Sequence, residues 1–251
     1  MRMEMGQTHF KGEWMNPHRG SLAVLAGTGD RNDGVFNLHR GEFHGTAFCL
    51  ASNLFITAAH VYEAAVATGP VALGRLGPPG EQVQLVRDAE TFPHVDLALM
   101  LCPNLSAEVL PFNFEPLTWL TDVFSIGYAF GSEMAAKEGE PHVYYLRAFK
   151  GYVVTRRGLT QLRGVPPGYE ISFAPPPGLS GAALLVPHGE NAAVAGVVLT
   201  HHTAELAGRR MDLGLAVDSE ELLTIESRIV GGSIAERLFQ RERVPQRNRR
   251  P

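Results

Sequence analysis

Short apolar runs separated by turn residues are the feature that most limits how this chain can fold. Runs such as Gly45–Leu50 and Leu97–Cys102 are a few residues long, and 27 glycines and 17 prolines are spread among the 251 residues. Few stretches have the spacing of a long amphipathic helix, whereas short runs of Val, Leu, Ala and Phe bounded by turn residues are typical of β-strands. The sequence therefore predicts a β-rich protein, built as a barrel or a sandwich.

With 45% hydrophobic residues, the chain can bury the core of one large domain or of two smaller lobes. Its formal net charge of -4 gives no overall positive field, so nucleic acid is not an expected partner. Only residues 237–251 are locally basic. A weak role of this tail in binding RNA or an acidic partner is the alternative to a solvated, disordered end.

The sequence predicts a cytoplasmic protein with no membrane span. Residues 1–14 carry charged side chains and lack the apolar run of a secretory signal, and no stretch approaches the roughly 18 apolar residues needed to cross a bilayer. Cys49 and Cys102 lie inside apolar runs, where a small buried side chain explains them. We expect reduced thiols rather than a disulfide.

The strand pattern divides the chain into six predicted parts. They are an N-terminal extension at 1–20, a first β-barrel lobe at 21–102, an inter-lobe connector at 103–120, a second β-barrel lobe at 121–217, a C-terminal helix at 218–232 and a basic, disordered tail at 233–251. Strands are predicted at 21–25, 45–50, 54–60, 71–76, 82–87, 97–102, 123–127, 143–155, 169–173, 182–186, 193–200 and 211–217. Asp218 is expected to cap the helix, which continues to about Ile229 and stops at Gly231.

The stretch Pro175–Ala183, PPPGLSGAA, looks like a loop that presents a nucleophile. Its prolines favour extended geometry, and Gly178 and Gly181 allow backbone conformations that a Cβ would forbid. Ser180 is therefore expected at a tight turn with backbone N–H groups exposed nearby. An ordinary Pro-Gly turn leading into a strand is the alternative, because short motifs recur by chance. A histidine and a carboxylate in suitable places would decide between the two.

His60 and Asp96 are the matching candidates. His60 follows the strand-like run Leu54–Ala59 and precedes a short helical pattern. Asp96 stands at the entrance of the apolar run Leu97–Leu101, where a carboxylate needs hydrogen-bond donors, and an imidazole N–H is one of the few neutral donors that would hold it ionised. A serine hydroxyl becomes a nucleophile when a base removes its proton, and the base needs a third group to fix its tautomer.

The order His60, Asp96, Ser180 resembles that of trypsin- and chymotrypsin-like serine proteases. The matching pieces, which together span roughly residues 20–230, are Gly45–Phe48, Thr57–His60, Asp96–Leu99, Gly178–Gly181, Ala195–Val198 and Leu213–Val217. The resemblance implies an all-β fold of two six-stranded antiparallel β-barrels (chymotrypsin-like) with a short C-terminal helix. The nucleophile elbow of α/β-hydrolases fits less well, because it needs Gly-x-Ser-x-Gly and Ala182 occupies the last position.

By this resemblance Ser180 is the nucleophile, His60 is the general base and then the general acid, and Asp96 orients His60. The backbone N–H groups of Gly178 and Ser180 match the oxyanion hole of the family. The resemblance also implies a protein or peptide substrate and a reaction that uses neither a cofactor nor a metal.

The same resemblance places Ala174 at the base of the primary specificity pocket and Gly214 on a neighbouring wall. Leu199 belongs to the strand that pairs with substrate, and His201 follows it. An uncharged base argues against a strong Arg/Lys preference and for small or apolar side chains. In some relatives a histidine near His201 or His202 selects acidic or glutamine side chains, and a solvent-facing pair is the alternative. No third ligand accompanies the two histidines, so no zinc site is predicted.

Two motifs depart from the family pattern. Leu179 stands where secreted members carry an aspartate that pairs with a newly cleaved N-terminus, so we do not expect activation by that route. Arg228–Gly232 resembles an activation site, but it follows the three candidate residues, and a helix end with a glycine stop explains it.

The sequence therefore indicates a serine endopeptidase with an apolar pocket. We expect its active site to be assembled as the chain is synthesised, or its activity to be controlled by something else, such as a regulatory partner protein. The alternative is a latent or inactive protease-fold module that binds peptides or partner proteins, for example within a stress or defence system.

Overall fold

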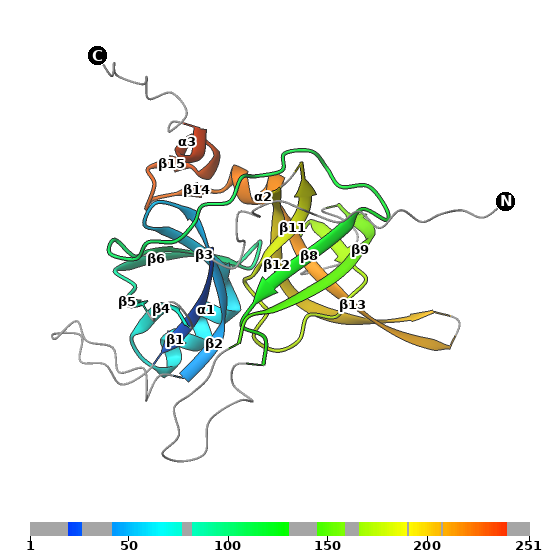
Figure 1. Ribbon diagram of the computed structural model, residues 1–251, viewed down its shortest axis with the longest axis horizontal. Coiled ribbons are helices and arrows are strands. Elements are labelled where there is room, and N and C mark those ends of the chain that lie inside the picture. The colour runs from blue at the N-terminus through cyan, green and yellow to red at the C-terminus, as the bar shows by residue number, and fades with distance from the viewer. Residues whose placement is uncertain are drawn as a thin grey trace.

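The computed structural model describes residues 20–26, 42–76, 82–130, 145–158, 166–189, 191–206 and 208–239. Two antiparallel β-sheets lie side by side and form the body of the protein (Figure 1). The segment between the last strand of the first sheet and the first strand of the second arches over both of them (Figure 1). It is joined to the second sheet by backbone hydrogen bonds between Asn113 and Val194 and between Val194 and Pro111.

The first sheet is curled and open. Its strands are β1 (Ser21–Ala26), β2 (Glu42–Ala51), β3 (Leu54–Ala58), β4 (Val71–Arg75), β5 (Gln82–Leu85), β6 (Asp88–Phe92) and β7 (Leu97–Leu101). They are arranged in the order β5-β4-β1-β2-β3-β7-β6. Every residue of β1 is buried, as is nearly all of β7, because both faces of these strands are covered. Helix α1 (Ala59–Thr68) follows β3 directly.

The second sheet is a closed barrel in the order β10-β13-β12-β11-β8-β9. Its strands are β8 (Asp122–Gly127), β9 (Arg147–Arg157), β10 (Gly168–Ile171), β11 (Ala183–His188), β12 (Asn191–Leu206) and β13 (Arg209–Asp218). In β8 buried and more exposed residues alternate, which is the period of a strand with one face on the core. The pairing of β12 with β13 continues to Leu206 and Arg209, and this long hairpin projects from the barrel (Figure 1).

After the barrel the chain returns to the first sheet. Asp218 caps helix α2 (Ser219–Thr224) by accepting a hydrogen bond from Glu221 N, as predicted. The prediction that this helix continues to about Ile229 is wrong. The chain instead forms a two-stranded ladder of β14 (Glu226–Ser227) and β15 (Gly232–Ser233). Helix α3 (Ile234–Phe239) follows, so the disorder predicted from residue 233 is wrong for these positions, and 240–251 lie outside the described residues.

The predicted all-β, chymotrypsin-like architecture is confirmed, with the difference that the first sheet has seven strands and does not close. Each predicted strand has a counterpart, but β6 was not predicted, because its sequence DAETF lacks the alternation of apolar and polar residues. It forms because each of its residues pairs with β7. Ala59 and His60 belong to α1 rather than to the end of β3.

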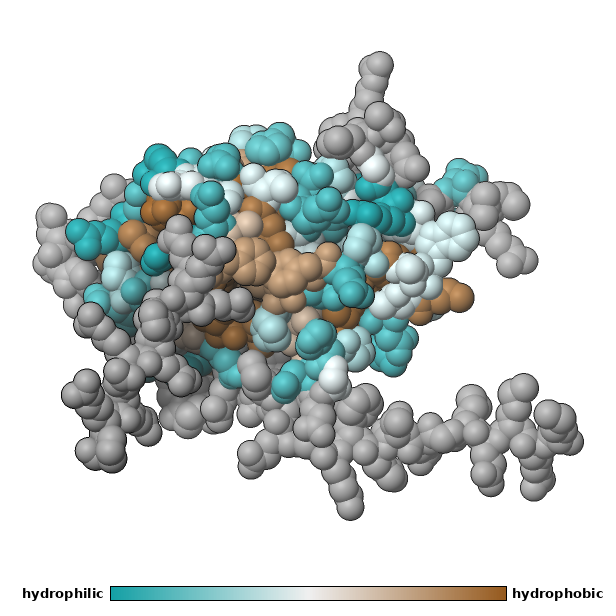
Figure 2. All heavy atoms as spheres, turned by 90° about the horizontal axis from the view of Figure 1, so that it is seen from above, coloured by the Kyte–Doolittle hydropathy of each residue, from teal (hydrophilic) through white to brown (hydrophobic). Residues whose placement is uncertain are grey.

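The two sheets share a hydrophobic core. Phe55 and Leu99 of the first sheet belong to the same buried cluster as Leu185 and Val197 of the barrel. Cys49 and Cys102 are free and buried, as predicted, and burial raises the pKa of the Cys102 thiol to about 12. Figure 2 shows one face of the protein, on which apolar side chains gather towards the middle and polar ones towards the rim. Among the described helices, none is long and apolar enough to span a membrane.

Arg228 attaches the β14–β15 ladder to β6. Its guanidinium donates to both carboxylate oxygens of Asp88, over 2.7 and 2.8 Å, and to Ala89 O over 2.7 Å. Ser227 Oγ donates to Glu90 Oε2 over 2.7 Å. The hydrogen bonds from Arg228 are the main reason why the pKa of Asp88 lies below its ordinary value of 3.8. The Asp88 carboxylate therefore holds the C-terminal segment against strand β6.

We expect Arg228→Met to speed amide hydrogen exchange in 226–234 while leaving exchange in the barrel unchanged. Arg228→Lys keeps the charge but loses the paired hydrogen bonds. Its exchange rates in 226–234 should therefore lie between those of the native protein and those of Arg228→Met. Because the folded-state pKa of Asp88 is lowered, this attachment contributes fully above pH 3.8 and is lost as the pH falls through the lowered pKa. Unchanged exchange in Arg228→Met at neutral pH would show that the ladder is held by its apolar contacts alone.

Candidate active site

Asp96 organises the start of helix α1. The residue before the helix, Ala58, has no side chain that can cap it. Instead, Asp96 Oδ1 accepts from His60 N over 3.0 Å, and Asp96 O accepts from Ala59 N over 2.9 Å. The second carboxylate oxygen, Oδ2, lies 2.8 Å from His60 Nδ1. One carboxylate therefore fixes both the backbone and the ring of His60.

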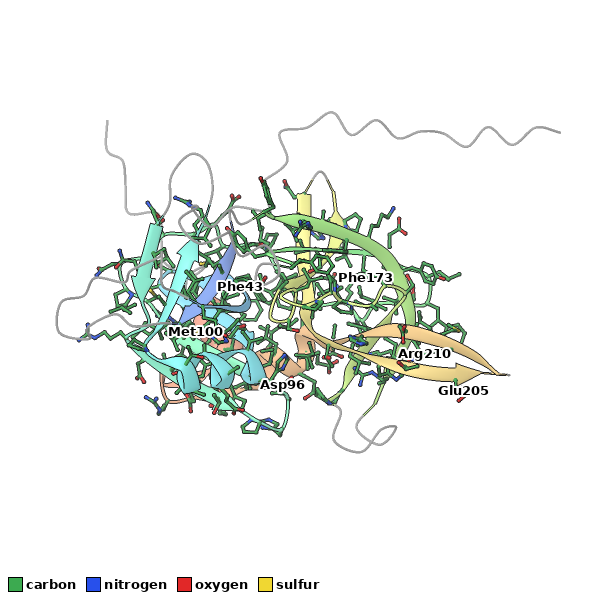
Figure 3. The ribbon with its side chains drawn as sticks, turned by 90° about the horizontal axis from the view of Figure 1, so that it is seen from below. Phe43, Asp96, Met100, Phe173, Glu205 and Arg210 are labelled. Atoms are coloured by element: carbon green, nitrogen blue, oxygen red, sulfur yellow. The ribbon has the colours of Figure 1, made fainter. Side chains whose placement is uncertain are left out.

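The turn at 93–96 between β6 and β7 brings Asp96 to this position. Leu97 pairs with Ala58, so the residue before Leu97 lies beside the first turn of α1. Asp96 has a φ of 53°, a left-handed conformation that aspartate tolerates better than most residues. In Figure 3 it lies next to the helix of the first sheet, on the side nearer the barrel. The structure thus brings two of the three candidate residues into direct contact.

Ser180 lies in the loop between β10 and β11. Leu179 N donates to Pro176 O over 3.1 Å, which closes a tight turn. Gly178 has a φ of 88°, and a Cβ at this position would lie 2.8 Å from Tyr128 O, so the turn requires glycine. Leu179 is fully buried in the barrel core. Leu179, which stands where secreted members of the resembled family carry an aspartate, therefore holds the loop in place by apolar packing.

The backbone N–H groups of this loop divide into two kinds. Those of Leu179, Gly181 and Ala182 donate to Pro176 O, Val198 O and Leu179 O, respectively. Those of Gly178 and Ser180 find no acceptor among the described residues. The two N–H groups that the family resemblance pointed to are therefore the two left open, and open N–H groups of this kind can bind a developing negative charge.

The hydroxyl of Ser180 is not yet engaged with His60. Within the described part of the chain, no hydrogen bond joins Ser180 Oγ to His60 Nε2, and the His60 side chain is 46% exposed. Such contacts are often long in ligand-free enzymes and tighten when substrate binds.

A pocket of about 380 Å³ lies beside the His60 ring. It is lined by α1, the 93–96 turn, the segment before β10 and the β12–β13 hairpin, through Ala59, His60, Glu63, Pro93, Asp96, Pro166, Leu199, Thr200 and Leu215. Leu199 and Leu215 give it apolar walls, while Glu63 and Asp96 supply the charge. Of the four predicted substrate-binding residues, Leu199 is the one that this pocket brings next to His60 and Asp96.

The other three predicted substrate-binding residues lie elsewhere along the same loop and hairpin. Ala174 is exposed, whereas Gly214 is buried, and a Cβ on Gly214 would come within 2.4 Å of Phe173 O and 2.9 Å of Pro175 Cδ. The chain around Ala174 is therefore packed closely on Gly214. His201 pairs with Gly214 and is exposed.

His201 and His202 point to opposite faces of β12, because successive side chains of a strand alternate. His202 Nε2 lies 3.3 Å from Glu170 Oε1 on β10. In the described residues, no three His, Cys, Asp or Glu side chains cluster in a way that could hold a metal ion. The two histidines therefore have separate environments.

Sequence reasoning gave no role to Thr46, although Gly45–Phe48 was one of the matched pieces. Thr46 N donates to Ser180 O over 3.0 Å, and Thr46 Oγ1 donates to Gly178 O over 2.8 Å. These bonds connect β2 of the first sheet to the serine loop of the second. The only sequence signal was the position of Thr46 after a glycine at the start of an apolar run.

Comparisons with known proteins agree with this geometry. The family described as trypsin-like peptidase domain matches residues 45–196, more than half of the chain. Among curated proteins, none matches this sequence.

Solved structures that are similar in fold include two proteases. The active form of the M. tuberculosis protease Rv3671c is 19% identical, with a TM-score of 0.54 over 82% of this chain and 78% of that one. The HtrA-type protease AlgW with a decapeptide is 15% identical, with a TM-score of 0.55 over 81% of this chain and 62% of that one. With the family match and the two β-sheets described above, these similarities show that the chain belongs to the trypsin-like peptidase domains, a family of serine proteases.

Proposed function

We propose that this protein is a serine endopeptidase that forms an acyl-enzyme on Ser180. The observation that carries the proposal is the hydrogen bond between His60 Nδ1 and Asp96 Oδ2, at 2.8 Å, in a chain whose serine loop leaves the N–H groups of Gly178 and Ser180 open. A carboxylate only accepts hydrogen bonds, so Nδ1 carries the proton and Nε2 is free to act as a base.

In the proposed reaction, His60 Nε2 takes the proton of Ser180 Oγ as the oxygen attacks the carbonyl carbon of the substrate. The carbonyl oxygen becomes negative and is bound by the N–H groups of Gly178 and Ser180. His60 then gives its proton to the leaving amine, and the carbon–nitrogen bond breaks. A water molecule, activated by the same imidazole, releases the acyl group from Ser180.

We propose that the substrate lies in extended form along the edge of β12 that begins at Leu199. The other edge of this part of β12 pairs with β13, whereas the edge towards the serine loop loses its partner β11 after Val197. Ala174 and Gly214 carry no charge, and the atoms nearest to a Cβ on Gly214 belong to Phe173, Ile171 and Pro175, which are uncharged as well. These features favour a small or apolar side chain before the cleaved bond. His201 lies next along this edge as a polar contact.

A fluorophosphonate probe tests the proposal. We expect the folded protein to be labelled on Ser180, and Ser180→Ala to lose at least about 10^4-fold in labelling rate, since removal of a nucleophile removes the covalent step. Ser172→Ala is a matched control, because it removes a serine hydroxyl of the same segment, one that accepts from Tyr152 N. A folded protein that resists the probe would refute the proposal. If the protein is labelled, digestion of a peptide library would show which side chains it prefers before the cleaved bond.

The second candidate function is a latent module that binds peptides or partner proteins without cleaving them. The missing hydrogen bond between Ser180 Oγ and His60 Nε2 within the described residues favours it. Such a module would bind library peptides equally well as the native protein and as Ser180→Ala, with no product from either. Turnover by the native protein alone would exclude it.

A further inference from the structure

Thr46 is a fully buried polar residue that the proposed reaction does not use. Its hydroxyl accepts a hydrogen bond from Tyr128 N over 3.0 Å and donates one to Gly178 O over 2.8 Å. Its backbone N–H donates to Ser180 O over 3.0 Å, and its carbonyl accepts from Thr57 Oγ1 over 2.7 Å. This residue of β2 therefore holds two separate segments of the barrel half of the molecule.

The direction of the Gly178 N–H group depends on the peptide plane that contains it. In a trans peptide the N–H points away from the carbonyl of the preceding residue, so a contact that holds the carbonyl also aims the N–H. Pro177 O shares this plane, and it accepts from Phe130 N over 2.7 Å. The segment that follows β8 thus aims the first of the two open N–H groups.

The next two peptide planes aim the second group. Gly178 O is held by Thr46 Oγ1, and the N–H of Leu179 in the same plane donates back into the turn. Leu179 O accepts from Ala182 N over 3.0 Å, which directs the Ser180 N–H to the opposite side. The plane held by Thr46 lies between the two planes that carry the open N–H groups. Because this plane shares the Cα atoms of Gly178 and Leu179 with those two planes, its displacement would move both of them.

The Thr46 hydroxyl also controls the first plane, through its bond to Tyr128 N. Tyr128 is fully buried, and its own hydroxyl contacts Leu76 N and Leu76 O over 3.0 and 3.1 Å. It stands two residues before Phe130, whose N–H holds Pro177 O. The space for this arrangement depends on Gly127, because a Cβ there would lie 2.7 Å from Thr46 Oγ1.

We propose that the Thr46 hydroxyl is a positioning group that keeps the Gly178 and Ser180 N–H groups aimed at one point. This inference rests on the proposed peptidase function, in which that point is occupied by the negatively charged oxygen. Thr46 does not touch the substrate. It acts through the serine loop.

Thr46→Val and Thr46→Ser test the role of the hydroxyl. Valine keeps the shape and removes the two hydroxyl bonds, whereas serine keeps them. We expect the fluorophosphonate labelling rate to fall about 10- to 100-fold in Thr46→Val and to stay within about threefold of the native rate in Thr46→Ser, because small misplacements of such donors are costly. Ser125→Ala is the matched control, since it removes another buried hydroxyl, which donates to Ala183 O over 2.9 Å.

All rates are divided by the folded fraction measured by circular dichroism, so that a loss of stability alone does not lower them. Equal corrected rates in Thr46→Val and the native protein would overturn the inference. The ¹⁵N–¹H resonance of Gly178 gives a readout that needs no reaction. It should shift or broaden in Thr46→Val and keep its native position in Thr46→Ser and Ser125→Ala. If the native protein resists the probe, the peptidase proposal fails, and an unmoved Gly178 resonance separately refutes the positioning role.

Discussion

Asp96→Asn is expected to slow the reaction of Ser180 with a fluorophosphonate by about 10^4-fold without unfolding the protein. Both carboxylate oxygens are in use, since Oδ1 accepts from His60 N and Oδ2 accepts from His60 Nδ1. An asparagine side chain has one oxygen acceptor. If that oxygen keeps the helix contact, the amide NH2 group faces Nδ1, and the proton must move to Nε2. His60 then holds its proton on the side where it must accept one.

Glu63→Gln is the control for this experiment. Glu63 lines the same pocket as His60 and is exposed, but no described hydrogen bond joins it to the ring. Like Asp96→Asn, the Glu63→Gln substitution removes one negative charge. It should leave the labelling rate within about threefold of the native value, because exposed charges are screened by water. Asp96→Asn and Glu63→Gln variants with equal rates would mean that Asp96 acts only as a nearby charge. Nearly native labelling of Asp96→Asn would remove it from the reaction altogether.

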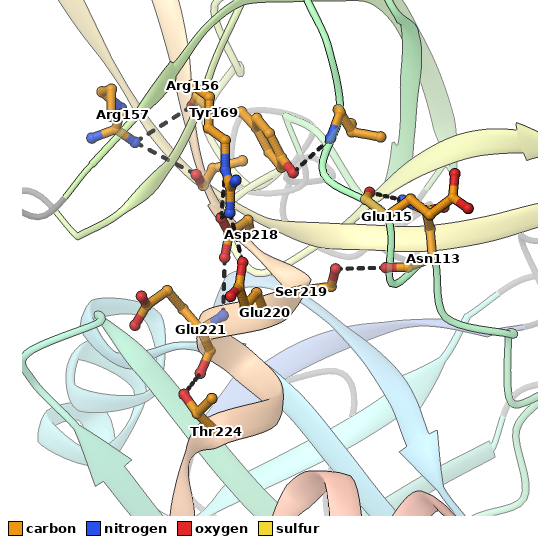
Figure 4. A network of polar contacts seen from close by, with 12 residues as sticks. Asn113, Glu115, Arg156, Arg157, Tyr169, Asp218, Ser219, Glu220, Glu221 and Thr224 are labelled. Carbon is orange, nitrogen blue, oxygen red and sulfur yellow. Dashed lines mark hydrogen bonds and ion pairs between the residues drawn. The ribbon is translucent and has the colours of Figure 1, made fainter.

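Asp218→Ala should have the largest effect on stability, lowering the free energy of unfolding by about 2–3 kcal/mol. Asp218 is 2% exposed. Its Oδ1 caps α2 by accepting from Glu221 N over 2.9 Å, and its Oδ2 accepts from Arg156 Nη2 over 3.1 Å (Figure 4). Removal of the carboxylate deletes the cap and leaves Arg156 with Glu220 as its remaining partner. Because Arg156 is 39% exposed, water limits the loss to less than that of a fully buried pair.

Urea unfolding followed by circular dichroism measures this effect. Asp218→Asn keeps an acceptor for the helix cap and should lose about half as much as Asp218→Ala. Glu220→Gln, whose side chain is 68% exposed, should change the unfolding free energy by less than about 0.5 kcal/mol. A loss below about 1 kcal/mol in Asp218→Ala would show that the free-energy cost of burying the ion pair is about as large as the stabilisation that the pair provides.

The fold could be predicted from the sequence because its strands are short apolar runs with turn residues between them. The proposed site follows the same pattern, since His60, Asp96 and the glycine-framed Ser180 each stand at the end of such a run, and the structure brings the first two into contact. Strand β6 was missed because it has no apolar run, with Ala89 and Phe92 as its only apolar residues, and it is held by pairing with β7. Local patterns cannot show a strand whose stability comes from its neighbour.

Other features depend on contacts between distant parts of the chain. The end of α2 was predicted too late, since the glycines at 231–232 belong to a ladder that Arg228 ties to Asp88, 140 residues earlier. The bond from Thr46 to Gly178 spans 132 residues. A threonine in an apolar run looks like an ordinary strand residue until the fold brings the serine loop against it. The pocket beside His60 likewise combines α1, the 93–96 turn and the β12–β13 hairpin.

The proposed catalytic residues are divided between two bodies: His60 and Asp96 belong to that of the first sheet, whereas Ser180 belongs to a loop of the barrel. A rigid shear of one body past the other by about 1 Å would separate the base from the hydroxyl while both β-sheets stayed intact, and such a displacement can cost about 100-fold in rate. Thr46 supplies polar links across that boundary, as do Ser21 and Leu76. The rate of the proposed reaction therefore depends on how firmly the two bodies are packed against each other.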